Sequence, residues 1–226
     1  MARVALTILG APGAGKGTQA RMLGAELNYP WISTGDMLRE AVKDGTTLGG
    51  EVQGYMERGG LVPDALVDRI IRDRLAREDC RNGFILDGYP RTIQQAQFLD
   101  TLLCGEGSRI LAIGITVGSD VLLGRLAGRW TCPKCGKMFN IMSNPSKAGD
   151  DCDECGTHLV LRKDDSTRVV EERLQVYHQL TEPLIQYYRS RGCYAEVDGE
   201  QSADQIHGAI MAIMKARLGQ RGAVIP

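Results

Sequence analysis

The sequence has little net charge, no long apolar run and no internal repeat. Its 27 basic and 28 acidic side chains give a formal net charge of -1 at pH 7, which argues against nucleic acid or an anionic membrane as the main partner. No apolar run approaches the roughly 20 residues that span a bilayer. Residues 1–4 lead straight into an apolar segment, which predicts no signal peptide. We therefore expect a cytoplasmic protein.

The 226 residues, of which 43% are hydrophobic, are enough for an α/β domain with insertions. Apolar segments lie at 4–9, 84–86, 110–117 and 193–197, and a shorter one lies at 31–33. Helical patterns fill the gaps between them. Short apolar strands that alternate with helices predict a parallel sheet that is covered on both faces.

Three helices have clear boundary signals. Apolar residues at helical spacing over 67–75 predict a helix with Asp64 as its N-cap. The pattern over 170–188 predicts a helix that is bent or broken near Pro183. Ser202 and Gln205 form a capping box, which predicts a final helix starting after Ser202.

The segment Gly-Ala-Pro-Gly-Ala-Gly-Lys-Gly-Thr at 10–18 follows the first apolar run. Its glycines let successive N–H groups face an anion, the helix that begins near Gly15 directs its positive end to the same point, and Lys16 adds a full charge. This predicts a nucleoside triphosphate site. Gly17 stands between Lys16 and Thr18, where the strict pattern has Ser or Thr directly after Lys. A tight loop with a chance lysine is the alternative, and a dinucleotide-binding loop is disfavoured by the glycine spacing.

Four of the seven cysteines form two copies of Cys-x-x-Cys-Gly, separated by sixteen residues, at Cys132, Cys135, Cys152 and Cys155. Two such pairs supply the four sulfur ligands that Zn²⁺ prefers, and a closed sulfur shell predicts a structural metal. Disulfides or chance are the alternatives, and iron or cobalt could occupy the same thiolates. We call residues 129–162 the cysteine insert. Between Cys132 and Cys155 it has three lysines against four acids, a balance that does not suit nucleic acid.

Asp87 ends the apolar run 84–86, which places its carboxylate at the carboxyl edge of the sheet, where it is suited to hold Mg²⁺ through water. A set of cations suited to several phosphates consists of Lys16, Arg39, Arg91, Arg125, Arg129, Arg162 and Arg173. No nucleophile or general base accompanies this set. Phosphoryl transfer to an acceptor that is already ionised needs none, since it requires positioning, charge neutralisation and exclusion of water.

The chain resembles an adenylate kinase of the long-lid, metal-containing bacterial type, from Gly10 to about Gln201. The motifs that carry the resemblance are the loop at 10–18, Ser-Thr-Gly-Asp-Met-Leu-Arg at 33–39, Asp-Gly-Tyr-Pro-Arg-Thr at 87–92 and Arg-Lys-Asp-Asp at 162–165. The family loop has Gly-Thr after its lysine, so Gly17 fits. The resemblance implies a P-loop kinase fold, with a central parallel sheet flanked by helices, a small metal-binding lid insertion and a helical AMP-binding segment.

The resemblance also implies reversible, Mg²⁺-dependent phosphoryl transfer from ATP to AMP, giving two ADP. The residues it implies for ATP are Gly13, Ala14, Gly15, Lys16, Gly17, Thr18, Arg125, Arg129, Met138, Phe139 and Gln201. Those for AMP are Thr34, Arg39, Gly60, Leu61, Val62, Gly88, Tyr89, Pro90, Arg91, Gln95, Arg162 and Arg173. The catalytic cations are Lys16, Arg39, Arg91, Arg129, Arg162 and Arg173, and Thr18 and Asp87 are associated with Mg²⁺.

Two positions depart from the family pattern. Trp130 follows Arg129 where a second arginine is common, and Gln201 stands where lysine is frequent. Since the resemblance implies a backbone contact at Gln201, we expect that change to be mild.

The expected division is a core of 1–32, 63–128 and 163–218, an AMP-binding segment of 33–62, a lid of 129–162 and a loose tail of 219–226. A monomer that acts on ATP, AMP and ADP is expected, with neither nucleic acid nor membrane as partner. The rivals are a kinase of UMP or CMP and a nucleic-acid-dependent ATPase or switch with a zinc ribbon. The long metal lid, Thr34 and Gln95 favour AMP over the first rival.

Overall fold

The structure, a computed structural model, describes residues 3–104, 108–141, 144–161 and 167–218. Its centre is a parallel sheet in the order β2-β3-β1-β4-β8. The strands are β1 (Val4–Leu9), β2 (Trp31–Ser33), β3 (Gly83–Asp87), β4 (Arg109–Thr116) and β8 (Tyr194–Asp198). Each lies on one of the apolar segments, so the predicted parallel sheet is confirmed.

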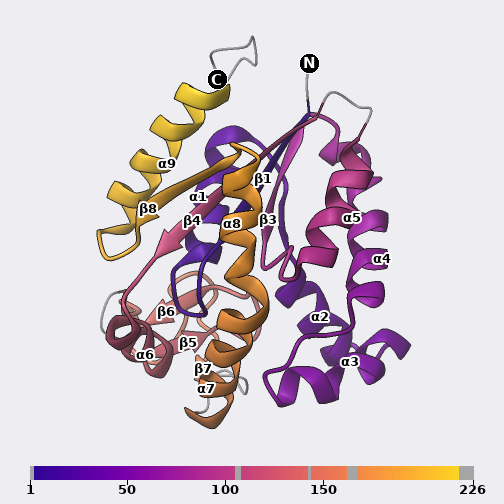
Figure 1. The fold of residues 1–226 in the computed structure, drawn as a ribbon. Helices are drawn as coiled ribbons and strands as arrows, with labels where there is room; N and C mark the ends of the chain where they lie inside the picture. The colour runs from indigo at the N-terminus through magenta and orange to yellow at the C-terminus, as the bar shows by residue number, and fades with distance from the viewer. Residues whose placement is uncertain (1–2, 105–107, 142–143, 162–166, 219–226) are drawn as a thin grey trace.

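Helices cover both faces of this sheet (Figure 1). They are α1 (Lys16–Leu27), α2 (Thr34–Lys43), α3 (Thr47–Glu57), α4 (Asp64–Leu75), α5 (Ile93–Leu103), α6 (Ser119–Ala127), α7 (Thr167–Val176), α8 (Pro183–Ser190) and α9 (Ala203–Leu218). A 3₁₀ turn, Glu78–Cys80, precedes β3. A π-helical turn, Tyr177–Thr181, separates α7 from α8, and Pro183 begins α8, so the predicted break near Pro183 is confirmed.

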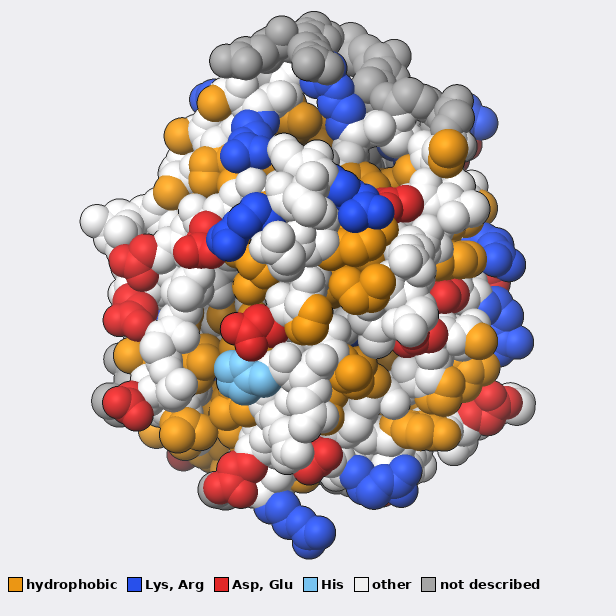
Figure 2. Space-filling view, in the orientation of Figure 1, with side chains coloured by type: hydrophobic (Ala, Val, Ile, Leu, Met, Phe, Trp, Pro, Cys, Tyr) orange, Lys and Arg blue, Asp and Glu red, His pale blue; other side chains and the backbone are white. Residues whose placement is uncertain are grey.

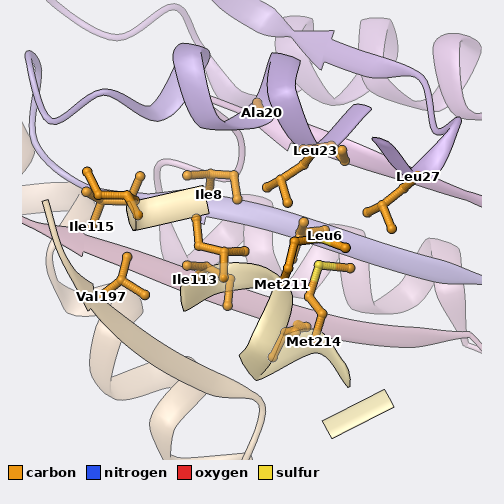
Figure 3. Packing of buried hydrophobic residues seen from close by; sticks show 14 of the residues in the cluster. Leu6, Ile8, Ala20, Leu23, Leu27, Ile113, Ile115, Val197, Met211 and Met214 are labelled. Carbon is orange, nitrogen blue, oxygen red and sulfur yellow. The ribbon is translucent and has the colours of Figure 1, made fainter. Parts of the chain in front are cut away.

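The core is split by the sheet into layers, one of which lies against α1 and α9. In Figure 3, Leu6 and Ile8 of β1 and Ile113 of β4 lie between these two helices. Residues of one strand that are two apart share a face, which is why Leu6 and Ile8 pack together. On the other face, Ala5, Phe84 and Leu86 pack against the helices from α2 to α5.

The parallel register brings three strand ends to one edge. Ile8 of β1 pairs with Asp87 of β3, and Ser33 of β2 pairs with the same Asp87. The loop at 10–18, the 33–39 motif and the 87–92 motif therefore leave the sheet side by side. In open parallel sheets this carboxyl edge is where ligands bind.

The cysteine insert forms a second, antiparallel sheet in the order β6-β5-β7, between α6 and α7. Its strands are β5 (Arg129–Thr131), β6 (Met138–Asn140) and β7 (Val160–Leu161). It has a small buried cluster of its own, made of Cys132, Phe139, Cys152 and Leu159. The insert thus folds around the cysteines rather than around the main core.

Two predicted helix caps have different outcomes. Ser202 and Gln205 exchange the two bonds of a capping box, so that prediction is confirmed. The prediction of Asp64 as an N-cap is wrong, because Pro63 is the cap and Asp64 is the first residue of α4. The Asp64 carboxylate accepts hydrogen bonds from Thr92 and Gln95 instead.

Acidic and basic side chains are interspersed over the face of the molecule in Figure 2. This mixed pattern agrees with a formal net charge of -1. Within the described ranges, no helix is both long and apolar enough to cross a bilayer.

Candidate active site

The glycine-rich loop turns sharply between β1 and α1. Gly13 and Gly15 have φ of 87° and 92°, in the left-handed region that a side chain disfavours. Gly15 is the N-cap of α1, with no side-chain cap, so the first N–H groups of that helix face the loop. Exposed N–H groups and the helix dipole together form an anion site.

Lys16 lies inside this loop. Its ammonium donates to the carbonyl oxygens of Gly10 at 2.9 Å and Ala11 at 2.8 Å. Burial lowers the pKa of Lys16 to about 7, Asp87 opposes that change, and Arg91, Arg173 and Arg129 add to it. An anion that entered here would relieve the repulsion among these cations and favour the charged form of Lys16.

Asp87 approaches the loop from the end of β3. A Cβ placed on Gly17 would stand 3.1 Å from the Asp87 carboxylate and 3.3 Å from the methyl group of Met138. Burial raises the pKa of Asp87, and Lys16, Arg91 and Arg39 lower it. The carboxylate thus sits close to the Gly17 backbone, with Thr18 next along the chain.

Two pockets open from this edge of the sheet. The first, which we call the loop pocket, has an empty volume of about 1500 Å³ that includes open solvent. Its lining includes predicted ATP residues from three parts of the chain, Gly13, Ala14, Gly15, Lys16, Gly17, Thr18, Arg125, Arg129, Met138, Phe139 and Gln201. Phe139 also belongs to the buried cluster of the insert.

Hydrogen bonds hold the far wall of the loop pocket in place. Arg125 donates to the Gly199 carbonyl at 2.9 Å, and Gln19 donates to the Ala203 carbonyl at 2.8 Å. The Gln201 side chain donates to Asp198. The segment between β8 and α9 is therefore fixed against both α1 and α6.

The second pocket, which we call the α2–α4 pocket, has an empty volume of about 610 Å³ that includes open solvent. Predicted AMP residues that line it are Thr34, Arg39, Gly60, Leu61, Val62, Gly88, Arg91, Gln95 and Arg173. The remaining wall is mostly apolar and comes from Leu38, Met56 and Val67.

Three arginines line both pockets, Arg39, Arg91 and Arg173. Arg39 pairs with Asp36 at 2.5 Å, and Arg91 donates through Nε to the Gly88 carbonyl at 2.8 Å. Lys16, on the loop pocket side, experiences the charges of Arg91 and Arg173. The cations therefore gather where the two pockets meet, an arrangement that suits two phosphate groups facing each other.

Two predicted AMP residues lie outside the α2–α4 pocket. The Tyr89 side chain is fully buried, and its hydroxyl donates to Asp68 at 2.7 Å, with the Gln95 carbonyl 3.2 Å away. Pro90 lines a neighbouring cavity together with Lys16 and Arg91. Arg162 and the rest of the 162–165 motif lie outside the described residues.

The pocket has residues that the sequence reasoning missed. Val67 begins the apolar helical pattern 67–75, which predicts core, Leu38 stands inside the 33–39 motif without an assigned role, and Met56 lies in the segment 33–62. The place of Leu38 inside the 33–39 motif was the signal that could have assigned it to a ligand wall.

The four cysteines of the insert come together as predicted. Their ligand atoms all lie within 4.8 Å of one another, with Cys132 Sγ 3.4 Å from Cys155 Sγ and Cys135 Sγ 3.5 Å from Cys152 Sγ. A tetrahedral zinc with bonds of about 2.3 Å needs sulfur–sulfur separations of about 3.8 Å. Gly136 and Gly156 have φ of 73° and 65°, the tight turns that the two glycines were expected to permit. This site can hold a metal.

Comparison with known proteins gives the family. The family model described as adenylate kinase matches residues 8–193. The chain belongs to the adenylate kinase family. It is accordingly a nucleoside monophosphate kinase, an ATP:AMP phosphotransferase.

Curated relatives named adenylate kinase match over nearly the whole chain. One from Moorella thermoacetica is 49% identical and covers 93% of this chain and 96% of its own length. Another, from Thermodesulfovibrio yellowstonii, is 47% identical and covers 94% of this chain and 99% of its own length. A third, from Agathobacter rectalis, is 45% identical and covers 92% of this chain and 98% of its own length. The family and the reaction expected from the motifs are confirmed.

Proposed function

We propose that ATP binds in the loop pocket and AMP in the α2–α4 pocket, so that the γ-phosphoryl group passes between them at the shared arginines. The observation that carries this proposal is that Arg39, Arg91 and Arg173 line both pockets. Lys16 and Arg129 complete the cation set on the ATP side. Arg162, from the resemblance, is proposed to join them.

The proposed chemistry is charge neutralisation without a general base. The AMP phosphate is already ionised at neutral pH, so no proton has to be removed from the attacking oxygen. Lys16 and the arginines would stabilise negative charge on the oxygens of the group in transfer. Burial lowers the pKa of Lys16, and the negative charge of entering phosphates would favour its ammonium form again.

We propose that Mg²⁺ enters with ATP, beside Asp87 and Thr18. Their carboxylate and hydroxyl oxygens are hard donors of the kind that Mg²⁺ prefers. The closeness of the Asp87 carboxylate to the Gly17 backbone places it next to the phosphate loop, which fits this assignment. When bound, the ion would add positive charge to the phosphates.

We propose that the cysteine insert and the segment 33–62 move over the site and exclude water, around a core of 1–32, 63–128 and 163–218. Residues 219–226 would take no part. The contact between Lys43 of the segment and the Pro133 carbonyl of the insert, at 3.3 Å, supports a joint cover. Water exclusion would suppress hydrolysis of ATP.

Zinc is the metal that we propose for Cys132, Cys135, Cys152 and Cys155, in a structural role, with iron or cobalt as alternatives. The sulfur separations support it because they bracket the value for tetrahedral zinc. None of the seven cysteines, all of which lie in described residues, forms a disulfide. That agrees with the reducing cytoplasm that we propose as its location.

A monomer that acts on free nucleotides, without nucleic acid or membrane, completes the proposal. The monomer is what the resemblance to the family implies. A formal net charge of -1 favours small ligands over a polyanion.

Single variants in each pocket test the assignment. Arg125→Ala should raise the KM for ATP about tenfold and leave the KM for AMP within about twofold. Leu38→Ala should raise the KM for AMP and leave the KM for ATP within about twofold, since the Leu38 side chain lines only the AMP pocket. Steady-state kinetics with each nucleotide varied in turn measures both. Equal effects on the two KM values in both variants would refute separate pockets.

A further inference from the structure

Asp64 joins the start of α4 to the start of α5. Its Oδ2 accepts from the Thr92 hydroxyl at 2.7 Å, and its Oδ1 accepts from Gln95 Nε2 at 2.8 Å. Thr92 is the N-cap of α5, and its Oγ1 accepts from the Gln95 N–H at 3.1 Å. Both carboxylate oxygens therefore serve the 92–95 turn.

These contacts fix the orientation of the Gln95 amide. Gln95 Oε1 accepts from the backbone N–H of Arg91 at 2.7 Å, while Nε2 donates to Asp64. An ionised carboxylate can only accept and a backbone N–H can only donate, so the two ends of the amide cannot exchange places. Gln95 is 2% exposed, so water offers its side chain little alternative to these partners.

Gln95 lines the α2–α4 pocket beside apolar residues such as Leu38 and Val67. The bond to Asp64 uses one N–H of the amide and the bond from Arg91 uses one lone pair of its oxygen, which leaves one of each for a ligand. The edge of adenine offers N1 as an acceptor and its 6-amino group as a donor. Hypoxanthine, a purine of similar size, has the opposite polarity at both atoms. A fixed amide can distinguish the two, whereas an amide free to turn can match either.

We propose that Asp64 is a positioning residue that fixes Gln95 against the acceptor base and thereby selects adenine. The proposal rests on the assignment of the α2–α4 pocket to AMP. Removing the Asp64 carboxylate leaves a buried amide N–H without its acceptor, so that only the bond from the Arg91 N–H to Oε1 still favours this orientation of the amide. A lost buried hydrogen bond of this kind corresponds to about a tenfold effect.

The experiment compares variants by the KM for AMP, the KM for ATP, kcat, and the ratio of kcat/KM for AMP to that for inosine monophosphate. Asp64→Ala should raise the KM for AMP about tenfold and lower the AMP preference about tenfold, with the KM for ATP unchanged. Asp64→Asn should keep the KM for AMP and the AMP preference near those of the unmodified protein. Its side-chain oxygen can accept from Gln95 while its amide donates to Thr92. Asp64→Ser, which is too short to reach Gln95, should behave like Asp64→Ala and serves if the alanine variant does not fold.

Asp100→Ala is the matched control. Asp100 lies on α5, away from both pockets, and its carboxylate accepts from the Tyr187 hydroxyl at 2.6 Å. This variant should lower thermal stability without changing the AMP preference. If Asp64→Ala and Asp64→Ser only lower stability, as the control does, the proposal is refuted.

Gln95→Leu separates this proposal from the one on which it rests. It should raise the KM for AMP at least as much as Asp64→Ala does. Combining the two substitutions should raise this KM little beyond the value for Gln95→Leu alone. An unchanged KM for AMP in Gln95→Leu would refute the pocket assignment itself. A raised KM in Gln95→Leu with no change in Asp64→Ala would refute the role of Asp64 alone.

Discussion

Replacing Cys132 by serine tests what holds the cysteine insert together. Its buried cluster has four members, two of which are themselves proposed metal ligands. The other two, Phe139 and Leu159, contribute about 1.5–3 kcal/mol each when buried, or about 3–6 kcal/mol together. A structural zinc site contributes about 10–16 kcal/mol. The metal should therefore dominate the local stability.

Sharing the metal term among four ligands gives about 3 kcal/mol for each thiolate. Since about 1.4 kcal/mol is a factor of ten in an equilibrium constant, Cys132→Ser should weaken metal binding about a hundredfold. Metal content after dialysis and hydrogen exchange of the insert amides, such as the Cys132 N–H that donates to Lys137, measure this effect. Amides of β1 should stay protected, and turnover at low temperature should change less than insert protection.

Cys104→Ser is the control for this experiment, because Cys104 is an exposed thiol outside the cluster. It should keep full metal content and unchanged exchange. The reasoning fails if Cys132→Ser retains metal and insert protection as Cys104→Ser does. It also fails if removal of the metal from the unmodified protein leaves the insert amides protected.

Three further substitutions test the site and its frame. Arg91→Ala should lower kcat by about 10²–10³-fold while the thermal transition stays near that of the unmodified protein, because it removes a charge at the junction of the pockets; near-normal turnover would sink that role. Gly10→Ala should lower both Tm and kcat, since its Cβ would stand 2.7 Å from the Ile115 carbonyl oxygen at a φ of 146°, and unchanged values in calorimetry and assay would contradict this. Gly124→Ala should stabilise by about 0.5–1 kcal/mol by denaturant unfolding, because nothing lies within 4 Å of a Cβ there and the helix gains from losing a glycine; a loss of stability would count against it.

Local signals predicted the sheet and the four-cysteine cluster well. The apolar segments at 4–9 and 84–86 are strands whose residues are buried without interruption, as expected of strands in a parallel sheet that is covered on both faces. Cys-x-x-Cys-Gly specifies its own turn, so both cysteine pairs could be placed without knowledge of the fold. The motifs at 33–39 and 87–92 could be brought together because parallel strands end at one edge.

What the sequence could not supply depends on contacts between distant residues. Asp64 follows a proline at a helix start, a pattern that favours a cap, but Thr92 and Gln95, about thirty positions away in sequence, hold its carboxylate. Tyr89 lies within a nucleotide motif, yet its ring is buried and its hydroxyl reaches Asp68. A short-range sequence pattern does not reveal which distant residues such a side chain will contact.

The most direct test of the account follows ADP and inorganic phosphate together after mixing the metal-loaded enzyme with Mg²⁺ and ATP. With AMP present, two ADP should form for each ATP consumed, with little phosphate released. Without AMP, or with UMP, CMP or DNA in its place, ATP should remain largely intact. Phosphate release that is independent of AMP or stimulated by DNA, or faster transfer to UMP, would contradict the account.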